Sequence, residues 1–311
     1  MARKGGNRKA AKRRPFRRLI LFCITAAVGY VALCAGLVWY TLRPRQYALA
    51  ELPGRYGLIY GNVSFVSADG TRLAGWLIPA KVRRPRGLII LCHGVDGDRT
   101  TMLPTAQILN KHGYAVLMFD FRARGESSGS LCSLGYHEVD DLGAAIRYVQ
   151  SRQDTRRLPI GVLGQSLGAS VALICAAGNP QIRAVVAESP FTSLDRAVSN
   201  HFACVLGPAA PALSLPVTWI GERVIGCSCS EVSPISDIAR ISPRPVLLIQ
   251  DESDPVCPPE QTNALMAAAR EPKQLWQVPG AGHIQAEVAA PRLYAEEITR
   301  FFDSAQMRRA L

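Results

Sequence analysis

The chain has 311 residues, of which 48% are hydrophobic and 19% are charged. This composition suits one large or two modest globular domains and excludes a disordered or collagen-like protein. The formal net charge of +12 invites a nucleic-acid-binding function, but residues 1–45 hold eleven of the 36 Lys and Arg residues and no acid. Residues 46–311 contain 25 basic and 24 acidic residues. Because this larger part is nearly neutral, we expect no nucleic-acid partner.

A basic tail precedes a long apolar stretch at the start of the chain. Residues 1–18 contain nine Lys and Arg, and residues 19–42 contain no charged residue over 24 positions. About 20 apolar residues can cross a bilayer as a helix, whereas a cleaved signal peptide has an apolar region of roughly 7 to 15. We therefore predict one uncleaved transmembrane helix over residues 19–42. The positive-inside rule predicts a single-pass cell-membrane protein with a cytoplasmic tail and an extracytoplasmic domain.

A linker over residues 43–56 and a domain over residues 57–311 are expected to follow. The domain begins with two strands that meet at Asp69-Gly70, a hairpin turn signal. Apolar runs then alternate with helical patterns. The runs are GLIILCH, YAVLMFDF, PIGVLG, AVVAES, PVLLIQ and QLWQVP, and the helical patterns are TAQILNKHG, HEVDDLGAAIRYVQSR, SLGASVALICAAG, EQTNALMAAAR and PRLYAEEITRFF. This alternation predicts an α/β fold with a mostly parallel, eight-stranded sheet and helices on both faces.

Residues 195–243 interrupt the alternation with a segment rich in Pro and Cys, which we interpret as an insertion over one end of the sheet. Its Pro, Leu, Val and Trp219 side chains could form an apolar wall for acyl chains or an ordinary helical cover. In an oxidising space Cys204 could form a disulfide with Cys227 or Cys229, and free thiols are the alternative. The Cys-x-Cys pair has no second pair at zinc spacing, so we expect no metal.

The segment GVLGQSLGAS, residues 161–170, places Ser166 between Gly164 and Gly168, after an apolar run and before a helical pattern. The pattern Gly-x-Ser-x-Gly permits a tight, strained turn that exposes a serine nucleophile above the end of a sheet. A plain strand-to-helix turn is the alternative. The bare pattern occurs by chance in about one chain in ten of this length, so the surrounding residues must decide.

A serine nucleophile needs a base to take its proton and a carboxylate to orient that base. His283, in the segment GAGH, follows the last apolar run and comes after every candidate acid. His93 follows a different apolar run, His112 and His137 fall on or beside helices, and His201 lies in the insertion. These positions favour His283 as the base.

The domain resembles the α/β-hydrolase superfamily, near its serine-aminopeptidase-like and prolyl-oligopeptidase-like esterases. The resemblance covers nearly all of the domain and rests on LCHGVDGDR, FDFRARGESSG, GQSLGAS, SPISDIARISPRPVLLIQ, DESDPVCP and GAGH. It implies the α/β-hydrolase fold, with Ser166 as nucleophile, Asp254 as orienting acid and His283 as base. It also implies an oxyanion hole formed by the backbone N–H groups of Val95 and Leu167. We expect no cofactor.

The acid loop departs from the family pattern, because Gln250-Asp251 stands where His-Gly is usual. Asp251 and Glu252 could therefore be mistaken for the orienting acid. In the resemblance the acid stands one residue before a Pro-Val step, which selects Asp254.

The segment FDFRARGESSG carries Ala123 where the family has glycine, and we expect this change to be tolerated. Asp120 and Arg122, in the same segment, are expected to support the fold through ion pairs. Together these features predict a membrane-anchored serine hydrolase that cleaves a small-molecule, acyl or peptidyl ester, thioester or amide through an acyl-enzyme. An acyltransferase with the same triad and a non-catalytic scaffold or receptor are the alternatives.

Overall fold

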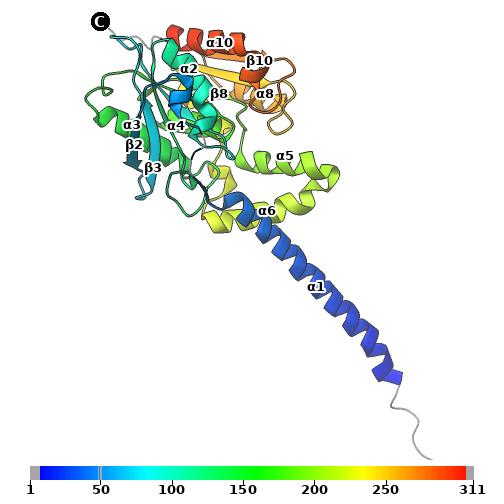
Figure 1. Ribbon diagram of the computed structural model, residues 1–311. Coiled ribbons are helices and arrows are strands. Elements are labelled where there is room, and N and C mark those ends of the chain that lie inside the picture. Colours follow the sequence, from blue (N-terminus) through cyan, green and yellow to red (C-terminus); the bar gives the residue numbers. More distant parts are fainter. Residues whose placement is uncertain (1–7, 48, 50, 306–311) are drawn as a thin grey trace, which may run out of the picture.

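An eight-stranded sheet forms the centre of the computed structural model, which describes residues 8–47, 49 and 51–305 (Figure 1). The strands lie in the order β10-β9-β8-β7-β4-β5-β3-β2. Their bounds are β2 Gly61–Val66, β3 Arg72–Ile78, β4 Leu88–Cys92, β5 Ala115–Phe119, β7 Ile160–Gln165, β8 Ile182–Glu188, β9 Val246–Asp251 and β10 Lys273–Val278. β3 pairs antiparallel with both of its neighbours, β2 and β5, and all the other pairs in this sheet are parallel. The predicted eight-stranded, mostly parallel sheet is confirmed.

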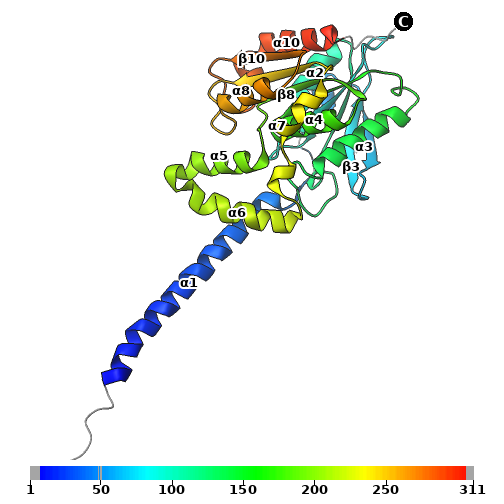
Figure 2. The same cartoon turned by 180° about the vertical axis from the view of Figure 1, so that it is seen from behind.

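Helices cover both faces of the sheet, as predicted (Figure 2). On one face α2 (Leu103–Lys111) and α10 (Pro291–Ser304) pack, and on the other α3 (Glu138–Ser151), α4 (Leu167–Gly178) and α8 (Pro259–Ala268). The central strands are apolar along their whole length because both of their faces are buried, whereas α10 buries one apolar stripe.

The order of the strands determines where a ligand can bind. β4 lies between β5 and β7, so the chain leaves β4 toward one side of the sheet and later returns on the other side. The loops that follow the carboxyl ends of β4 and β7 therefore diverge at this point, which in open parallel sheets is where ligands bind.

The apolar stretch near the start of the chain forms part of one long helix, α1 (Arg8–Leu42). Residues Phe16–Leu42 of this helix are long and apolar enough to cross a membrane, and only 6% of the most apolar window is buried. At 1.5 Å per residue these 27 residues span about 40 Å. Most of α1 projects from the body as a rod (Figure 1). Such an exposed N-terminal helix is typical of a membrane anchor or a signal sequence.

Within the expected linker, residues 45 and 46 form β1 (Arg45–Gln46), which pairs with β6 (Arg124–Gly125). A 3-10 helix, η1 (Pro53–Tyr56), follows. The segment directly after α1 is therefore hydrogen-bonded to the loop that follows β5.

The insertion after β8 forms two helices, α5 (Leu194–Leu206) and α6 (Ala210–Ile225), joined by η3 (Gly207–Ala209). We call α5, η3 and α6 the cover hairpin. It lies beside the body, next to the end of α1 (Figures 1 and 2). η4 (Cys229–Glu231), α7 (Pro234–Asp237) and η5 (Ile238–Ile241) then lead back to β9.

Two alternatives were considered for Cys204, a disulfide and a free thiol. The structure contains the free thiol. Cys204 lies near the tip of the cover hairpin, and its Sγ donates to the carbonyl oxygen of Pro255 at 2.8 Å. Cys227 and Cys229 follow the far end of α6, whose 16 residues span about 24 Å. A disulfide requires Cα atoms within about 7 Å, so the structure does not contain the bridge from Cys204 to Cys227 or Cys229.

Candidate active site

Ser166 lies at the sharp turn between β7 and α4, with φ 53° and ψ −114°. A positive φ is strained for a residue other than glycine. The flanking glycines are required by close backbone approach: a Cβ on Gly164 would lie 2.2 Å from the carbonyl oxygen of Gly168, and one on Gly168 would lie 2.2 Å from that of Cys92. The turn holds the serine at the carboxyl edge of the sheet.

His283 and Asp254 reach Ser166 from the loops that follow β10 and β9. Nε2 of His283 lies 2.9 Å from Oγ of Ser166, and Nδ1 lies 2.7 Å from Oδ2 of Asp254. With Nδ1–H donating to the carboxylate, Nε2 is free to accept from the serine hydroxyl. The structure therefore brings together the three side chains that the sequence analysis selected.

The surroundings of Asp254 favour the ionised form of its side chain, the carboxylate. Its Oδ1 accepts hydrogen bonds from the backbone N–H groups of Val256 and Cys257, both at 2.8 Å. Burial by itself would raise the pKa of Asp254, but the hydrogen bonds from His283 and from the Cys257 N–H hold that pKa below its usual value. A charged Asp254 can orient His283 and stabilise its protonated form.

Neither of the two rival acids is hydrogen-bonded to His283. Asp251 accepts from the Ser189 hydroxyl at 2.8 Å and from the Gln285 N–H at 3.3 Å. Burial, with the nearby charge of Asp254, raises the pKa of Asp251. The exposed Glu252 lies 3.4 Å from the N–H of Gly280.

The two backbone N–H groups expected to bind an oxyanion belong to Leu167, which follows Ser166, and to Val95, in the loop after β4. Leu167 is the first residue of α4, so its N–H has no helical partner. In the loop after β4, Nδ1–H of His93 donates to the carbonyl oxygen of Gly94 at 2.7 Å. Because a trans peptide points its C=O and N–H in opposite directions, this bond turns the N–H of Val95 away from His93. A Cβ on Gly94 would lie only 3.6 Å from Cβ of Ser166.

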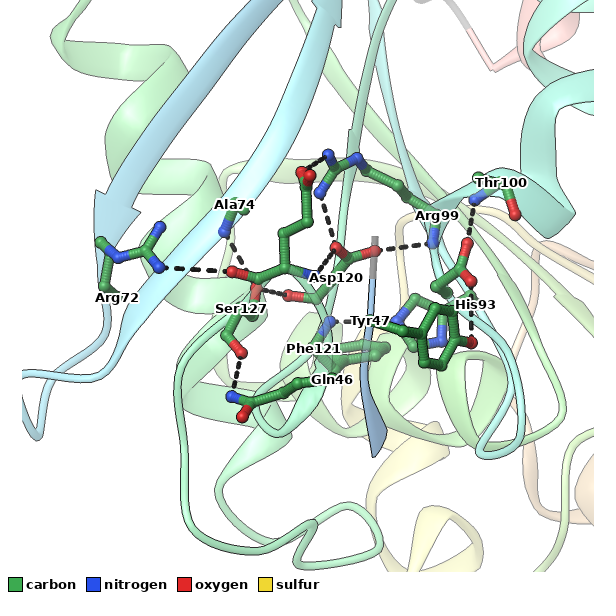
Figure 3. Close-up of polar contacts among 12 residues, drawn as sticks. Gln46, Tyr47, Arg72, Ala74, His93, Arg99, Thr100, Asp120, Phe121 and Ser127 are labelled. Carbon is green, nitrogen blue, oxygen red and sulfur yellow. Dashed lines mark hydrogen bonds and ion pairs between the residues drawn. The ribbon is translucent and has the colours of Figure 1, made fainter. Parts of the chain in front are cut away.

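His93 is a neutral structural residue. Its Nε2 accepts from the backbone N–H of Phe121 at 3.0 Å, so the ring proton lies on Nδ1 (Figure 3). Burial lowers its pKa to about 4. His93 thus fixes the loop that carries Val95 and does not compete with His283.

Asp120 and Arg122 lie in ion pairs, as expected. Asp120 accepts from Nη1 of Arg99 at 2.6 Å and from its backbone N–H at 2.8 Å (Figure 3). Burial raises the pKa of Asp120 to about 6, although the charge of Arg99 opposes this rise. Arg122 binds both oxygens of Asp141, at 2.6 and 3.0 Å, and also reaches Asp69. Both residues stabilise the loop after β5.

The sequence analysis missed Arg124, whose side chain is almost completely buried. Its Nε donates to the carbonyl oxygen of Val95 at 2.7 Å, and its Nη1 donates to that of Arg43 at 3.2 Å. Arg124 therefore connects the loop of Val95 to the end of α1. Both acceptors are backbone carbonyl oxygens. Because every residue has one, the sequence does not indicate these two hydrogen bonds.

Asp254, Cys257 and His283 also place possible metal-ligating atoms within 4.8 Å of one another, within the described part of the chain. A metal-bound cysteine is a thiolate, but burial and the charge of Asp254 raise the pKa of Cys257 far above its usual value. The other two side chains bind each other. This set of donors suits proton transfer better than metal binding.

Comparisons with known proteins agree with this fold. The profile of the family described as serine aminopeptidase, S33, matches residues 83–235, and that of the family described as TAP-like protein matches residues 216–310. The uncharacterized protein Rv2307c of Mycobacterium tuberculosis is 33% identical over 240 residues, which cover 77% of this chain and 78% of that protein. The polyketide transferase grgF of Penicillium is 25% identical over 264 residues, covering 72% and 89%.

Among solved structures, the esterase Pf2001 of Pyrococcus furiosus superposes with a TM-score of 0.68 at 25% identity, over 84% of this chain and 99% of that one. A puromycin hydrolase is similar in fold, with a TM-score of 0.67 at 16% identity over 82% of this chain and 40% of that one. The sheet, the serine turn and these similarities lead to one conclusion: the chain belongs to the α/β-hydrolase superfamily.

Proposed function

We propose that the chain is a membrane-anchored serine hydrolase that cleaves an ester, thioester or amide through an acyl-enzyme. The observation that carries this proposal is the continuous line of hydrogen bonds from Ser166 through His283 to Asp254, at 2.9 and 2.7 Å. In this proposal Ser166 is the nucleophile, His283 the base and Asp254 the orienting acid.

In the first half of the reaction, Oγ of Ser166 attacks the substrate carbonyl carbon while Nε2 of His283 takes the hydroxyl proton. The carbonyl oxygen becomes an oxyanion, which accepts hydrogen bonds from the N–H groups of Val95 and Leu167. Asp254 stabilises the imidazolium through Nδ1–H. The bond to the leaving alcohol, thiol or amine then breaks, the imidazolium supplies the proton that this group needs, and the acyl group stays on Ser166.

In the second half, water replaces the leaving group. Nε2 of His283 removes a proton from the water while its oxygen attacks the acyl carbon. The same N–H groups bind the second oxyanion. When the bond to Ser166 breaks, His283 returns the proton to Oγ, which releases a carboxylic acid and restores the enzyme.

The membrane part of the proposal rests on α1, with its apolar residues Phe16–Leu42 and the basic residues before them. By the positive-inside rule, the N-terminus lies in the cytoplasm and the hydrolase domain lies outside it, at the cell membrane.

Acyl transfer is a second candidate, because the same acyl-enzyme can pass its acyl group to an alcohol or amine. The relative grgF is named a polyketide transferase, which favours keeping this alternative. Product analysis separates the two functions: an added alcohol acceptor outcompetes water only in a transferase.

The direct test is to treat the full chain with a fluorophosphonate probe and to measure p-nitrophenyl butyrate hydrolysis. Ser166→Ala should abolish labelling and lower kcat by several orders of magnitude, since loss of a triad serine elsewhere costs on the order of a million-fold. The matched control is Ser230→Ala, which removes an exposed hydroxyl near α6. Residual activity of Ser166→Ala within about tenfold of the wild type would reject Ser166 as the nucleophile. A wild-type chain that neither reacts with the probe nor hydrolyses the ester would instead favour a non-catalytic scaffold.

A further inference from the structure

The cover hairpin contacts α1 inside the apolar stretch of that helix. The hydroxyl of Tyr30 donates to the carbonyl oxygen of Ala212, in the first turn of α6. One turn further along α1, Cys34 is buried, and so is Val38 one turn beyond it. The hairpin and the last turns of α1 therefore form one packed unit (Figure 2).

This contact sets the depth of the hairpin relative to a bilayer. A hydrocarbon core of about 30 Å takes up about 20 helical residues. If the core begins as early as Phe16, it ends near residue 36, and Tyr30 lies about 9 Å inside the boundary on the side of the domain. If the core begins later, Tyr30 lies deeper still. The start of α6 therefore lies at or below the membrane surface.

The outer surface of α6 has the composition expected at that depth. Pro211, Leu215 and Trp219 recur every four residues and form an exposed apolar stripe, in which Leu215 is 71% and Trp219 59% exposed. Arg223 continues the stripe, with its guanidinium 5.2 Å from the Trp219 ring. Leu and Trp side chains that end in a basic residue are typical of helices that lie in a membrane interface. Trp219 is therefore on the outer surface of the cover.

The hairpin also contacts the loop that carries Asp254. Nδ2 of Asn200 lies 3.5 Å from the carbonyl oxygen of Val256, and Sγ of Cys204 lies 2.8 Å from that of Pro255. α5 therefore lies against the acid loop from Asn200 to Cys204, near the tip of the hairpin.

The segment that follows α1 contacts the loops after β4 and β5. The N–H of Arg45 donates to the carbonyl oxygen of Ala123 at 2.8 Å, and Arg124 joins Val95 to Arg43. The loops at the carboxyl ends of β4 and β5 therefore lie next to the point where α1 leaves the domain.

We propose that the cover hairpin lies in the bilayer surface and that Ser166 takes its substrate from the membrane. The substrate class is a long-chain acyl ester or thioester: its alkyl chain remains among the lipid tails while its carbonyl group reaches Ser166. The inference rests on the proposed serine hydrolase function and adds the source of the substrate. It also gives the exposed apolar stripe a partner, the lipid of the leaflet nearest the domain.

The first test uses the full chain in phosphatidylcholine vesicles with two substrates. One is p-nitrophenyl palmitate dissolved in the vesicles, and the other is p-nitrophenyl butyrate in the water. The double variant Leu215→Glu with Trp219→Glu places two charges in the stripe, which should draw the hairpin out of the interface. We expect at least a tenfold loss of activity on palmitate and a change below twofold on butyrate.

The matched control is Ile59→Glu. The Ile59 side chain is 75% exposed and lies just before β2, which is an edge strand of the sheet. This change should affect neither substrate. Equal activity of the double variant on palmitate would overturn the inference, and so would an equal loss on both substrates, since the stripe would then serve the reaction itself. Failure of the proposed function is distinguishable, because Ser166→Ala would then retain activity on butyrate.

A second measurement does not depend on activity. In vesicles of dibrominated phosphatidylcholine, bromine in the acyl chains quenches tryptophan fluorescence at short range. The quenched signal should include a component that is lost in Trp219→Phe and kept in Trp276→Phe, since Trp276 lies on β10 in the sheet. Identical quenching in the wild type and in Trp219→Phe would place the stripe in water and overturn the inference.

Discussion

Nε of Arg124 donates a 2.7 Å hydrogen bond to the carbonyl oxygen of Val95, which joins the loop after β5 to the loop expected to bind the oxyanion. The other end of the guanidinium reaches the carbonyl oxygen of Arg43, at the end of α1. The position of the Val95 N–H therefore depends on a side chain that never faces the substrate.

From this contact we predict that Arg124→Met lowers kcat about tenfold to a hundredfold and changes KM much less. Complete removal of an oxyanion donor costs about 100- to 1000-fold, and a displaced donor should cost less. The measurement is steady-state hydrolysis of p-nitrophenyl butyrate. Arg72→Met, at an exposed arginine that contacts the same loop through the Glu126 carbonyl, is the control and should keep wild-type kcat. A folded Arg124→Met enzyme with unchanged kcat would contradict the predicted role.

The acid loop gives a second prediction, in which Asp254→Asn lowers kcat by about 1000- to 10,000-fold while Asp251→Asn lowers it by less than tenfold. Only Asp254 accepts a hydrogen bond from His283, so only its replacement disturbs the tautomer of the base. Asp251 binds Ser189 and Gln285. Single-turnover rates of the two purified variants provide the comparison, and a larger loss for Asp251→Asn would reverse the assignment.

Periodicity in the sequence predicted the sheet and its covering helices, because buried parallel strands and amphipathic helices carry strong apolar patterns. The cover hairpin gave no such pattern. Pro216 lies inside α6, where a sequence alone suggests a break, and the apolar stripe of α6 faces outward, away from the core. A helical cover was one of the two interpretations of this segment, but the bounds of its helices became evident only from the structure.

The candidate site was predictable as far as its chemistry depends on side chains in family motifs. The sequence indicated Ser166, Asp254 and His283, and the structure places them within hydrogen-bonding distance. The hydrogen bond from Arg124 to the carbonyl oxygen of Val95 was not predictable from the sequence. A residue of any type can accept such a bond through its backbone carbonyl group.

The cysteines give a third prediction: denatured protein prepared without reductant should show nine reactive thiols per chain, since all nine are free in the structure. Among the domain cysteines, Cys204 is exposed and should react first in the native protein, ahead of the buried Cys227 and Cys229. Thiol titration before and after reduction measures this. A gain of two thiols on reduction would show a disulfide that the structure lacks.

The last prediction concerns Glu188, a completely buried residue at the end of β8. Its oxygens accept from Nε2 of Gln165 at 2.9 Å and from the N–H of Ala286 at 3.2 Å. Burial, with the nearby charge of Asp251, raises the pKa of Glu188 from 4.5 to about 8. The folded chain therefore holds a proton on Glu188 that the unfolded chain releases at a much lower pH.

The sign of the effect on stability follows from this proton. Between pH 4.5 and about 8 the native state binds more protons at Glu188 than the unfolded state does, so its contribution to stability is complete below pH 4.5 and is lost as the pH rises to about 8. Glu188→Gln keeps a neutral side chain of the same shape and should remove this loss. In urea unfolding of the full chain in detergent micelles, the variant should gain on the order of a few kcal/mol relative to the wild type between pH 5.5 and pH 8.5. Glu252→Gln, at an exposed carboxylate, should leave the wild-type pH dependence unchanged. Parallel stability profiles for the wild type and Glu188→Gln would show that Glu188 is ionised in the native state and that its neighbours compensate for burial.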